Sequence, residues 1–243
     1  MDGVLPAVTL LGMGSPNVAK VVIALEEVGR AWDLRYVDVF AGEQFGAEIR
    51  RLNRNAKLPI LVDGPLILGE SGAILIHLAE SSGMLLPQDN PARAVALQWL
   101  MFQMSAFGPV SGQAIHFSAV NRDDSYARGR SRRELARLCA VIEEQLGDHR
   151  WIAGDTCSIA DIAHYPWART LQRFFPRLLD RPGLQRWMAA MASRAAVVRA
   201  YDHMDTLSRR DRLAMKAASP AQLDRYFGRT ESVWGPFEAW FDT

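Results

Sequence analysis

The sequence has few side chains that bind metals or form disulfides. Only two of its 243 residues are cysteine, Cys139 and Cys157, and they form neither a Cys-x-x-Cys motif nor a metal-ligand spacing. None of the five histidines pairs with another at metal-binding spacing beside a carboxylate. We therefore predict no metal, and the scarcity of cysteine favours a reducing cytoplasm.

The sequence also lacks an excess of charge and long apolar runs. Its 28 basic and 27 acidic residues leave a net charge of +1, which argues against recruitment by nucleic acid or by a membrane surface. No apolar run comes near the roughly 20 residues that a membrane-spanning helix needs. The start of the chain, Met1–Val4, lacks the basic and apolar segments of a signal peptide. What is present is ordinary globular usage, 49% apolar and 23% charged, in a chain long enough for one large domain or two smaller ones.

The most informative stretch is 55–71. Two short apolar runs, 60–62 and 66–68, flank an Asp-Gly-Pro break, which predicts a β-hairpin. A helix is expected to follow, with Ser71 as its N-cap, and a helix start of this kind favours an anion such as a ligand carboxylate. Pro59 stands at the entry to the first run and is a candidate cis proline.

Strand and helix signals alternate through the first third of the chain. The predicted elements are a strand at 7–11, a helix from Ser15-Pro16 to Gly29, a strand at 34–39, a short helix at 46–52, the hairpin and the helix from Ser71. The order β-α-β-α-β-β-α is that of a thioredoxin-like unit, a layered α/β fold. A thioredoxin would carry two cysteines where this chain has Ser15-Pro16-Asn17, so no thiol of the protein itself is expected there.

Four motifs in this half resemble those of one family. They are Ser-Pro-Asn at 15–17, Gly-Glu-Gln-Phe at 42–45, Leu-Asn-x-Asn-x-Lys-x-Pro at 52–59 and Glu-Ser-Gly-Ala-Ile-Leu at 70–75. Together they look like the nu-class bacterial glutathione transferases, which are best known for glutathione-dependent disulfide reduction and are related to a fungal prion-type nitrogen regulator. The resemblance implies the glutathione transferase fold, an α/β thioredoxin-like N-terminal domain plus an all-α C-terminal domain.

The resemblance also implies site residues by matching position. It places Ser15 and Asn17 at the glutathione sulfur as the catalytic pair. The implied glutathione-binding residues are Gln44 and Lys57 at the glycine end, Leu58 with Pro59 at the cysteinyl part, Glu70 and Ser71 at the γ-glutamyl end, and Arg130. For Lys57 taken alone, an exposed and solvated lysine is the alternative.

The chemistry expected of Ser15 and Asn17 is stabilisation of a thiolate. Hydrogen-bond donors and a helix N-terminus lower the pKa of a thiol, and the thiolate is its reactive form. Ser15 can donate through its hydroxyl and Asn17 through its amide. The alternative is that Ser15 is only a helix cap and Asn17 only a residue of the first turn.

The second half of the sequence reads as helical. We place a thioredoxin-like glutathione-binding domain at 1–86, an all-helical domain at 92–205 and a C-terminal extension at 206–243, with a turn-rich connector between the first two. Predicted helices cover about 91–120, interrupted at Gly108-Pro109, then 126–146, 182–201 and 220–227. Ser158 and Asp161 form a capping box that opens a further helix.

Several residues of the helical part remain open to two interpretations. Gln113 and His116 share a helix face and could line the substrate side, but a core or interface histidine is equally consistent. Arg130 is the match to the family's arginine by count, although its neighbours depart from the pattern, and a basic run usually marks a solvated helix face. Cys139 and Cys157 are not expected to act as nucleophiles.

We therefore expect a glutathione-dependent disulfide-bond oxidoreductase, a cytoplasmic homodimer that binds glutathione and a small disulfide and needs no metal. The alternatives are a conventional transferase that conjugates or cleaves a carbon electrophile, and a glutathione-binding regulator without useful turnover. The regulator is less favoured because the fungal relative's Asn-rich extension is not present here. Four aromatic residues at 234–241 are expected to pack on the protein's own surface, or else to cover part of the active-site cleft.

Overall fold

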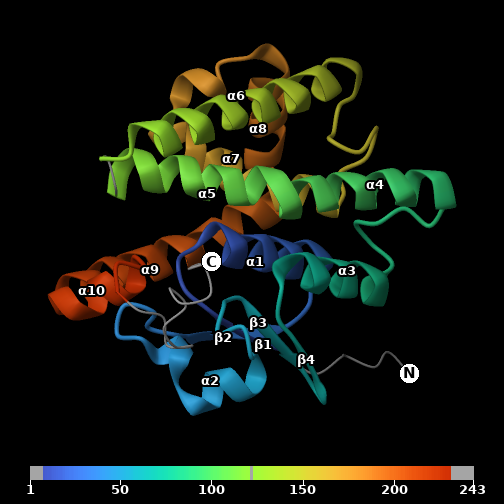
Figure 1. Ribbon diagram of the computed structural model, residues 1–243. Coiled ribbons are helices and arrows are strands. Elements are labelled where there is room, and N and C mark those ends of the chain that lie inside the picture. The colour runs from blue at the N-terminus through green and yellow to red at the C-terminus, as the bar shows by residue number, and fades with distance from the viewer. Residues whose placement is uncertain (1–7, 121–122, 231–243) are drawn as a thin grey trace, which may run out of the picture.

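The first third of the chain forms a four-stranded sheet, seen in a computed structural model that describes residues 8–120 and 123–230. The strand order is β2-β1-β3-β4 (Figure 1). β1 runs parallel to β2 and antiparallel to β3, and β3 forms a hairpin with β4. The strands are β1 (Val8–Gly12), β2 (Trp32–Tyr36), β3 (Ile60–Asp63) and β4 (Leu66–Leu68). The predicted hairpin and the predicted order of elements are confirmed.

Helices cover both faces of this sheet. α1 (Pro16–Val28) and α3 (Ser71–Ser82) lie on the face toward the rest of the chain, whereas η1 (Glu43–Phe45) and α2 (Ala47–Leu52) lie on the other (Figure 1). Successive strand residues point to opposite faces. Leu10 therefore joins the large core, and Leu11 packs with Ile49 of α2 in a smaller cluster.

The start of α3 differs from the expectation. The sequence predicts Ser71 as the N-cap, but the cap position is Glu70, and Ser71 is the first helical residue. Glu70 has φ 62° and ψ 110°, a conformation that cannot continue a helix, and its side chain makes no capping bond. The Ser71 hydroxyl is buried and bonded to another element, so it does not cap the helix.

The remainder of the described chain is helical. The elements are α4 (Asn90–Phe102), η2 (Gln103–Phe107), α5 (Gly108–Ile115), η3 (His116–Val120), α6 (Ser125–Asp148), α7 (Ile159–Phe174), η4 (Pro176–Leu178), α8 (Pro182–Ala192), α9 (Ala195–Ala217) and α10 (Pro220–Tyr226). The predicted capping box of Ser158 and Asp161 opens α7. No helix within the described residues is long and apolar enough to cross a bilayer.

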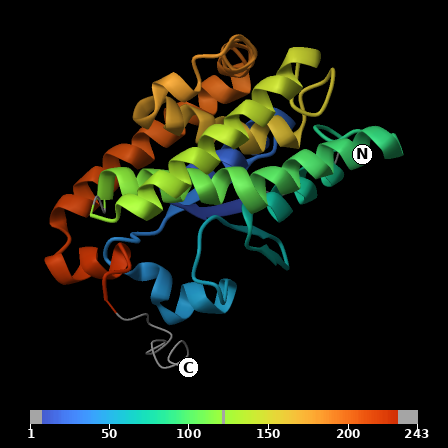
Figure 2. The same cartoon turned by 45° about the horizontal axis from the view of Figure 1, so that its top comes forward.

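The helix predicted over 91–120 keeps its direction but changes its winding. α4 ends at Phe102, and the π-helical segments η2 and η3 lie on either side of α5, so the chain continues as one long rod (Figure 2). Pro109 lies in the first turn of α5. A proline removes a backbone donor, and a π-turn can take up such a local fault without ending the helix.

The C-terminal helices differ most from the prediction. The helix expected over 182–201 is broken into α8 and the start of α9. α9 then continues to Ala217, through a charged segment for which no helix was predicted. Met204, Leu207 and Asp211 are buried at spacings of three and four, so one face of α9 packs on the first domain. α10 follows beside the loop that leads to α2, where the Tyr226 and Phe40 rings lie 4.6 Å apart (Figure 2). The aromatic residues at 234–241 lie outside the described residues.

One hydrophobic core joins the two parts of the molecule. Buried residues of α1 and α3 belong to the same cluster as those of α4 to α9. An ion pair reinforces the junction, because Arg194 donates through both Nε and a terminal nitrogen to Glu27 of α1, the second bond at 2.8 Å. The C-terminal end of α1 is therefore tied to the residue that precedes α9.

Candidate functional site

Two side chains at the start of α1 keep a hydrogen-bond donor free. Ser15 is the N-cap, and its Oγ accepts from the backbone N–H of Val18 at 3.3 Å, so its own hydroxyl hydrogen remains available. The side-chain oxygen of Asn17 accepts a bond of 3.1 Å from Nε1 of Trp167. Because a Trp nitrogen only donates, the amide is oriented with its Nδ2 donor left for another partner. Both residues are half-buried.

A cavity of about 630 Å³ opens beside Ser15, which is the one predicted site residue among those that line it. Ser15 and its neighbours form one wall, the C-terminal half of α7 forms a second, and α9 forms the third with Asp205 and Ser208. Two cations, Arg169 and Arg173 of α7, also line it. Thus α9, which the sequence prediction divided between the helical domain and the C-terminal extension, encloses part of the site.

The segment before β3 meets the start of α3 at the same end of the sheet. The peptide bond between Leu58 and Pro59 is cis, as the sequence allowed. The Asn55 amide lies 3.5 Å from Oε1 of Glu70, which ties the two stretches together. Lys57 is exposed, and its carbonyl accepts a bond of 2.9 Å from Asn53.

Two polar side chains of the predicted binding set are buried. Gln44 donates to the Val39 carbonyl at 3.2 Å, and its Oε1 has no partner among the described residues. The Ser71 hydroxyl accepts a bond of 3.3 Å from Lys20. The Ser71 hydroxyl in turn donates to Sδ of Met104 at 3.8 Å. Gln44 keeps its Oε1 and one amide hydrogen for a ligand.

The predicted site residues of the helical part lie away from the cavity beside Ser15. Gln113 is exposed on α5, and the half-buried His116 packs its ring against Phe117 at 5.2 Å. Arg130 is exposed on α6, where Arg137 and, more weakly, Arg130 lower the pKa of Glu134. None of these three residues lines the cavity beside Ser15.

Two charged residues that sequence analysis did not single out contact the site. Asp211 of α9 accepts the backbone N–H of Gly14 at 2.8 Å, and burial raises the pKa of its carboxyl. Lys20 is 1% exposed and reaches Ser71. Lys20 stands alone inside the apolar run 18–25, and this interruption is the signal that could have marked it.

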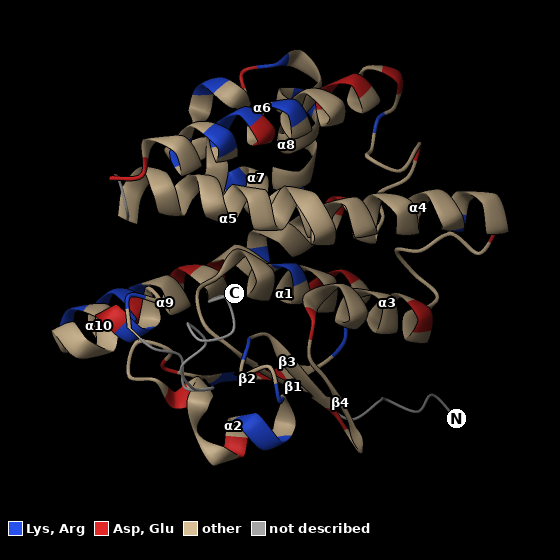
Figure 3. Cartoon of the chain, in the orientation of Figure 1, with Lys and Arg blue, Asp and Glu red and all other residues tan. Residues whose placement is uncertain are grey.

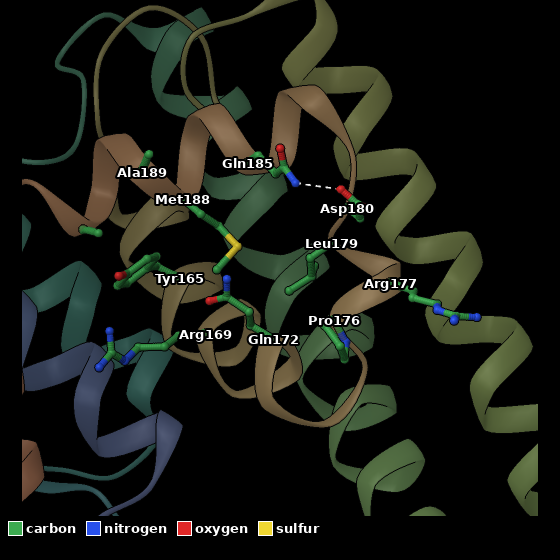
Figure 4. A pocket seen from close by; sticks show the side chains of 11 residues that line it. Tyr165, Arg169, Gln172, Pro176, Arg177, Leu179, Asp180, Gln185, Met188 and Ala189 are labelled. Carbon is green, nitrogen blue, oxygen red and sulfur yellow. Dashed lines mark hydrogen bonds between the residues drawn. The ribbon is translucent and has the colours of Figure 1, made fainter.

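A second cavity, of about 560 Å³, lies between the end of α7 and α8 (Figure 4). It shares Arg169 and Gln172 with the first cavity, and Gln185 donates to Asp180 at its rim at 2.8 Å. All of its lining residues come from 165–192, and none is a predicted site residue. The cavity beside Ser15 is therefore the better candidate site.

The cysteines are badly placed for nucleophilic chemistry. Burial raises the pKa of the Cys139 thiol to about 12, and burial also raises the pKa of Cys157. A thiol with a raised pKa holds little thiolate near neutral pH. Within the described residues no three His, Cys, Asp or Glu side chains gather as they would around a metal ion.

Known families and proteins are similar to this chain over both of its parts. The Glutathione S-transferase N-terminal domain family matches residues 12–84, and the corresponding C-terminal domain family matches residues 107–195. The disulfide-bond oxidoreductase YfcG of Escherichia coli is 38% identical over 190 residues, which cover 75% of this chain and 88% of YfcG.

Solved structures are similar over the same region. A glutathione transferase from Burkholderia graminis, with two glutathione molecules bound per subunit, is 41% identical with a TM-score of 0.77 and covers 81% of this chain and 88% of its own. One from Pseudomonas putida, with one glutathione disulfide bound per subunit, is 36% identical with a TM-score of 0.74, over 80% of this chain and 90% of its own. Fold, site and sequence thus lead to one conclusion: the chain belongs to the glutathione S-transferase family.

Proposed function

We propose that the protein is a glutathione-dependent disulfide-bond oxidoreductase of the nu class. The observation that carries the proposal is the Ser15 hydroxyl, a free donor that lines the cavity at a helix start without a cysteine, with the Asn17 amide donor two residues further on. A relative named as a disulfide-bond oxidoreductase, and a similar structure that holds glutathione disulfide, support it.

The glutathione-binding residues that we propose fit the ligand chemically. Lys57 offers a cation to the glycine carboxylate and Glu70 a carboxylate to the γ-glutamyl ammonium, and both are exposed. The backbone of Leu58, before cis Pro59, is available to the cysteinyl part. Gln44, Ser71 and Arg130 complete the proposed set, and the unpartnered Oε1 of Gln44 suits a ligand N–H.

Glutathione supplies the thiolate that attacks a disulfide: one S–S bond forms as another breaks, and the departing sulfur takes a proton. The protein orients and stabilises that thiolate. Ser15 and Asn17 donate to it, the N-terminal dipole of α1 favours its negative charge, and Trp167 holds the Asn17 amide in place. Arg169 and Arg173 give the cavity a positive wall, which suits a disulfide that carries carboxylates. We further propose that Gln113 and His116 line the substrate side of the site.

A pair of assays with Asn17→Ala tests the function. Purified protein is given glutathione and either a small model disulfide or a chloronitrobenzene. We expect disulfide turnover to dominate and to fall about 100-fold in Asn17→Ala, the usual cost of one donor to a stabilised anion. Asn90→Ala, an exposed asparagine at the start of α4, serves as the control and should keep full activity.

Other outcomes of these assays separate the alternatives. Faster turnover of chloronitrobenzene would assign conventional conjugation to a carbon electrophile. Binding of glutathione with neither reaction would assign a regulatory role. Full disulfide turnover in Asn17→Ala would contradict the role of the amide while leaving the reaction itself in place.

We also propose that the protein is a cytoplasmic homodimer. Residues 94–120 contain no Lys, Arg, Asp or Glu, and α4 and α5 stand out as almost uncharged (Figure 3). Val95 and Met101 of α4 and Leu66 and Ile67 of β4 are exposed apolar side chains. Such a surface invites association.

Light scattering after gel filtration tests the dimer. We expect twice the mass of one chain, and a shift to the monomer in Met101→Glu because a buried unpaired charge opposes association. The control is Val198→Glu, at an exposed apolar residue of α9, which should leave the mass unchanged. A monomeric wild-type protein at micromolar concentration would refute the proposal.

A further inference from the structure

Lys20 is a cation enclosed between the two parts of the molecule. Its side chain, on α1, is 1% exposed. Its Nζ lies 2.7 Å from Oε1 of Gln103, 3.3 Å from Oγ of Ser71 and 3.5 Å from Sδ of Met104. Gln103 and Met104 open the π-helical segment η2, so a lysine of the first domain is held by the irregular turn of the second.

This cation has no carboxylate partner. Its three partners are neutral, and none of the ion pairs among the described residues includes Lys20. A buried charge without a counter-charge is costly.

Two titratable groups, from α3 and α7, interact with Lys20. Glu70, the N-cap of α3, favours the charged form of Lys20 from an exposed position, and the charge of Lys20 in turn disfavours protonation of His164 of α7. Burial lowers the pKa of His164 to about 3, so this ring is neutral near pH 7. Burial lowers the pKa of Lys20 to about 7, with Glu70 acting in the opposite direction.

Ser71 links Lys20 to the site. Its oxygen accepts from Nζ, so its hydrogen points away from the ammonium, where Sδ of Met104 at 3.8 Å is its acceptor. A thioether sulfur is a weak acceptor, so a ligand carboxylate can take its place. The first N–H groups of α3 have no partner inside the helix and suit an anion in the same place. The neighbouring Gly72 lets η2 approach closely, because an added Cβ would lie 3.0 Å from the Met104 side chain.

We propose that Lys20 is a positioning residue of the glutathione site, whose ammonium orients the Ser71 hydroxyl toward a ligand carboxylate and supplies the counter-charge for that carboxylate. The inference rests on the proposed function, because the carboxylate is that of the γ-glutamyl end of glutathione. Lys20 acts through Ser71 and does not itself touch the reacting sulfur.

A coupling between binding and protonation follows. A nearby carboxylate favours the charged ammonium, so a bound ligand raises the pKa of Lys20 from its value of about 7 in the free protein. Lys20 contributes fully to affinity when the pH is below its pKa in the free protein. This contribution is lost as the pH rises through the higher pKa that Lys20 has in the complex. Binding above pH 7 therefore takes up a proton.

Calorimetry with S-methylglutathione tests this, because the ligand has no thiol to titrate. We expect the dissociation constant to be about fivefold larger at pH 8 than at pH 6 for a rise of one pKa unit on binding. At pH 7.5 the buffer supplies the proton that binding takes up, and phosphate and Tris have different heats of ionisation. The heats of binding measured in the two buffers should therefore differ by an amount that corresponds to part of a proton per ligand. These measurements use the wild-type protein, so they do not depend on a variant that folds.

Lys20→Met provides the second arm, with Lys216→Met on the exposed surface of α9 as its control. Lys20→Met should bind more weakly at pH 6, lose the pH dependence and take up no proton, whereas Lys216→Met should behave as wild type. Binding by the wild type without proton uptake, or proton uptake that persists in Lys20→Met, would overturn the inference and leave the proposed function intact. No binding by the wild type at either pH would overturn both.

Discussion

Replacing Asp161 by alanine is expected to lower the free energy of unfolding by about 3–5 kcal/mol, because it breaks a buried hydrogen-bond network. Asp161 is fully buried at the start of α7. Its carboxylate accepts from the backbone N–H groups of Ile152 and Ser158, both at 2.9 Å, and from Nε1 of Trp187 at 2.8 Å. Alanine would leave these three donors unsatisfied, and each buried unpaired donor costs about 1–3 kcal/mol, though not additively.

The midpoint of urea unfolding, followed by tryptophan fluorescence and by circular dichroism, measures this effect. Asp155→Ala is the matched control, because Asp155 is an exposed aspartate in the preceding turn. We expect that control to change stability by less than about 0.5 kcal/mol. An Asp161→Ala protein as stable as the control would show that the capping box contributes little to the fold.

Replacing Asp211 by alanine is expected to lower kcat/KM for disulfide reduction about 10- to 100-fold, the scale of a misplaced catalytic group. The Asp211 carboxylate holds the backbone N–H of Gly14, which immediately precedes Ser15. The contact is close, since a Cβ added at Gly14 would lie 2.5 Å from Oδ2. Loss of this bond frees the loop that carries the Ser15 hydroxyl, whereas the residues proposed to bind glutathione stay in place.

Steady-state kinetics of two further variants separate this role from a general loss of stability. Asp211→Asn keeps an oxygen that can accept from Gly14 and should recover most of the activity. Asp202→Ala, an exposed aspartate on the same helix, should match the wild type. If Asp211→Ala kept full activity while binding S-methylglutathione normally, α9 would have no part in shaping the catalytic loop.

Short-range signals carried much of the fold prediction. Ser15 with Pro16 opens α1, and Gly29, at φ 65°, closes it as the sequence indicated. Such caps are satisfied within a few residues of the helix end, so they can be recognised in a linear pattern. The hairpin and the helix that begins at Ile159 were predictable for the same reason.

Long-range contacts account for the errors. α9 was cut short in the prediction because its outer face is charged, and its apolar face has a partner only when α1 lies beneath it. The Ser71 hydroxyl was expected to cap its helix, but Lys20, 51 residues away in sequence, engages it. A helix boundary that depends on such partners leaves little trace in the local pattern.

The sequence by itself determined the family resemblance, the order of elements in the first domain and the polar residues proposed at the site, because short motifs and helix caps act over a few residues. Only the tertiary structure decided how those residues are oriented. Trp167, 150 residues from Asn17, sets the direction of its amide, and Asp211, 197 residues from Gly14, fixes the loop before Ser15. The physical reason is that a side chain's free donor depends on which of its other atoms is already bonded, and those partners come together only when the helices pack.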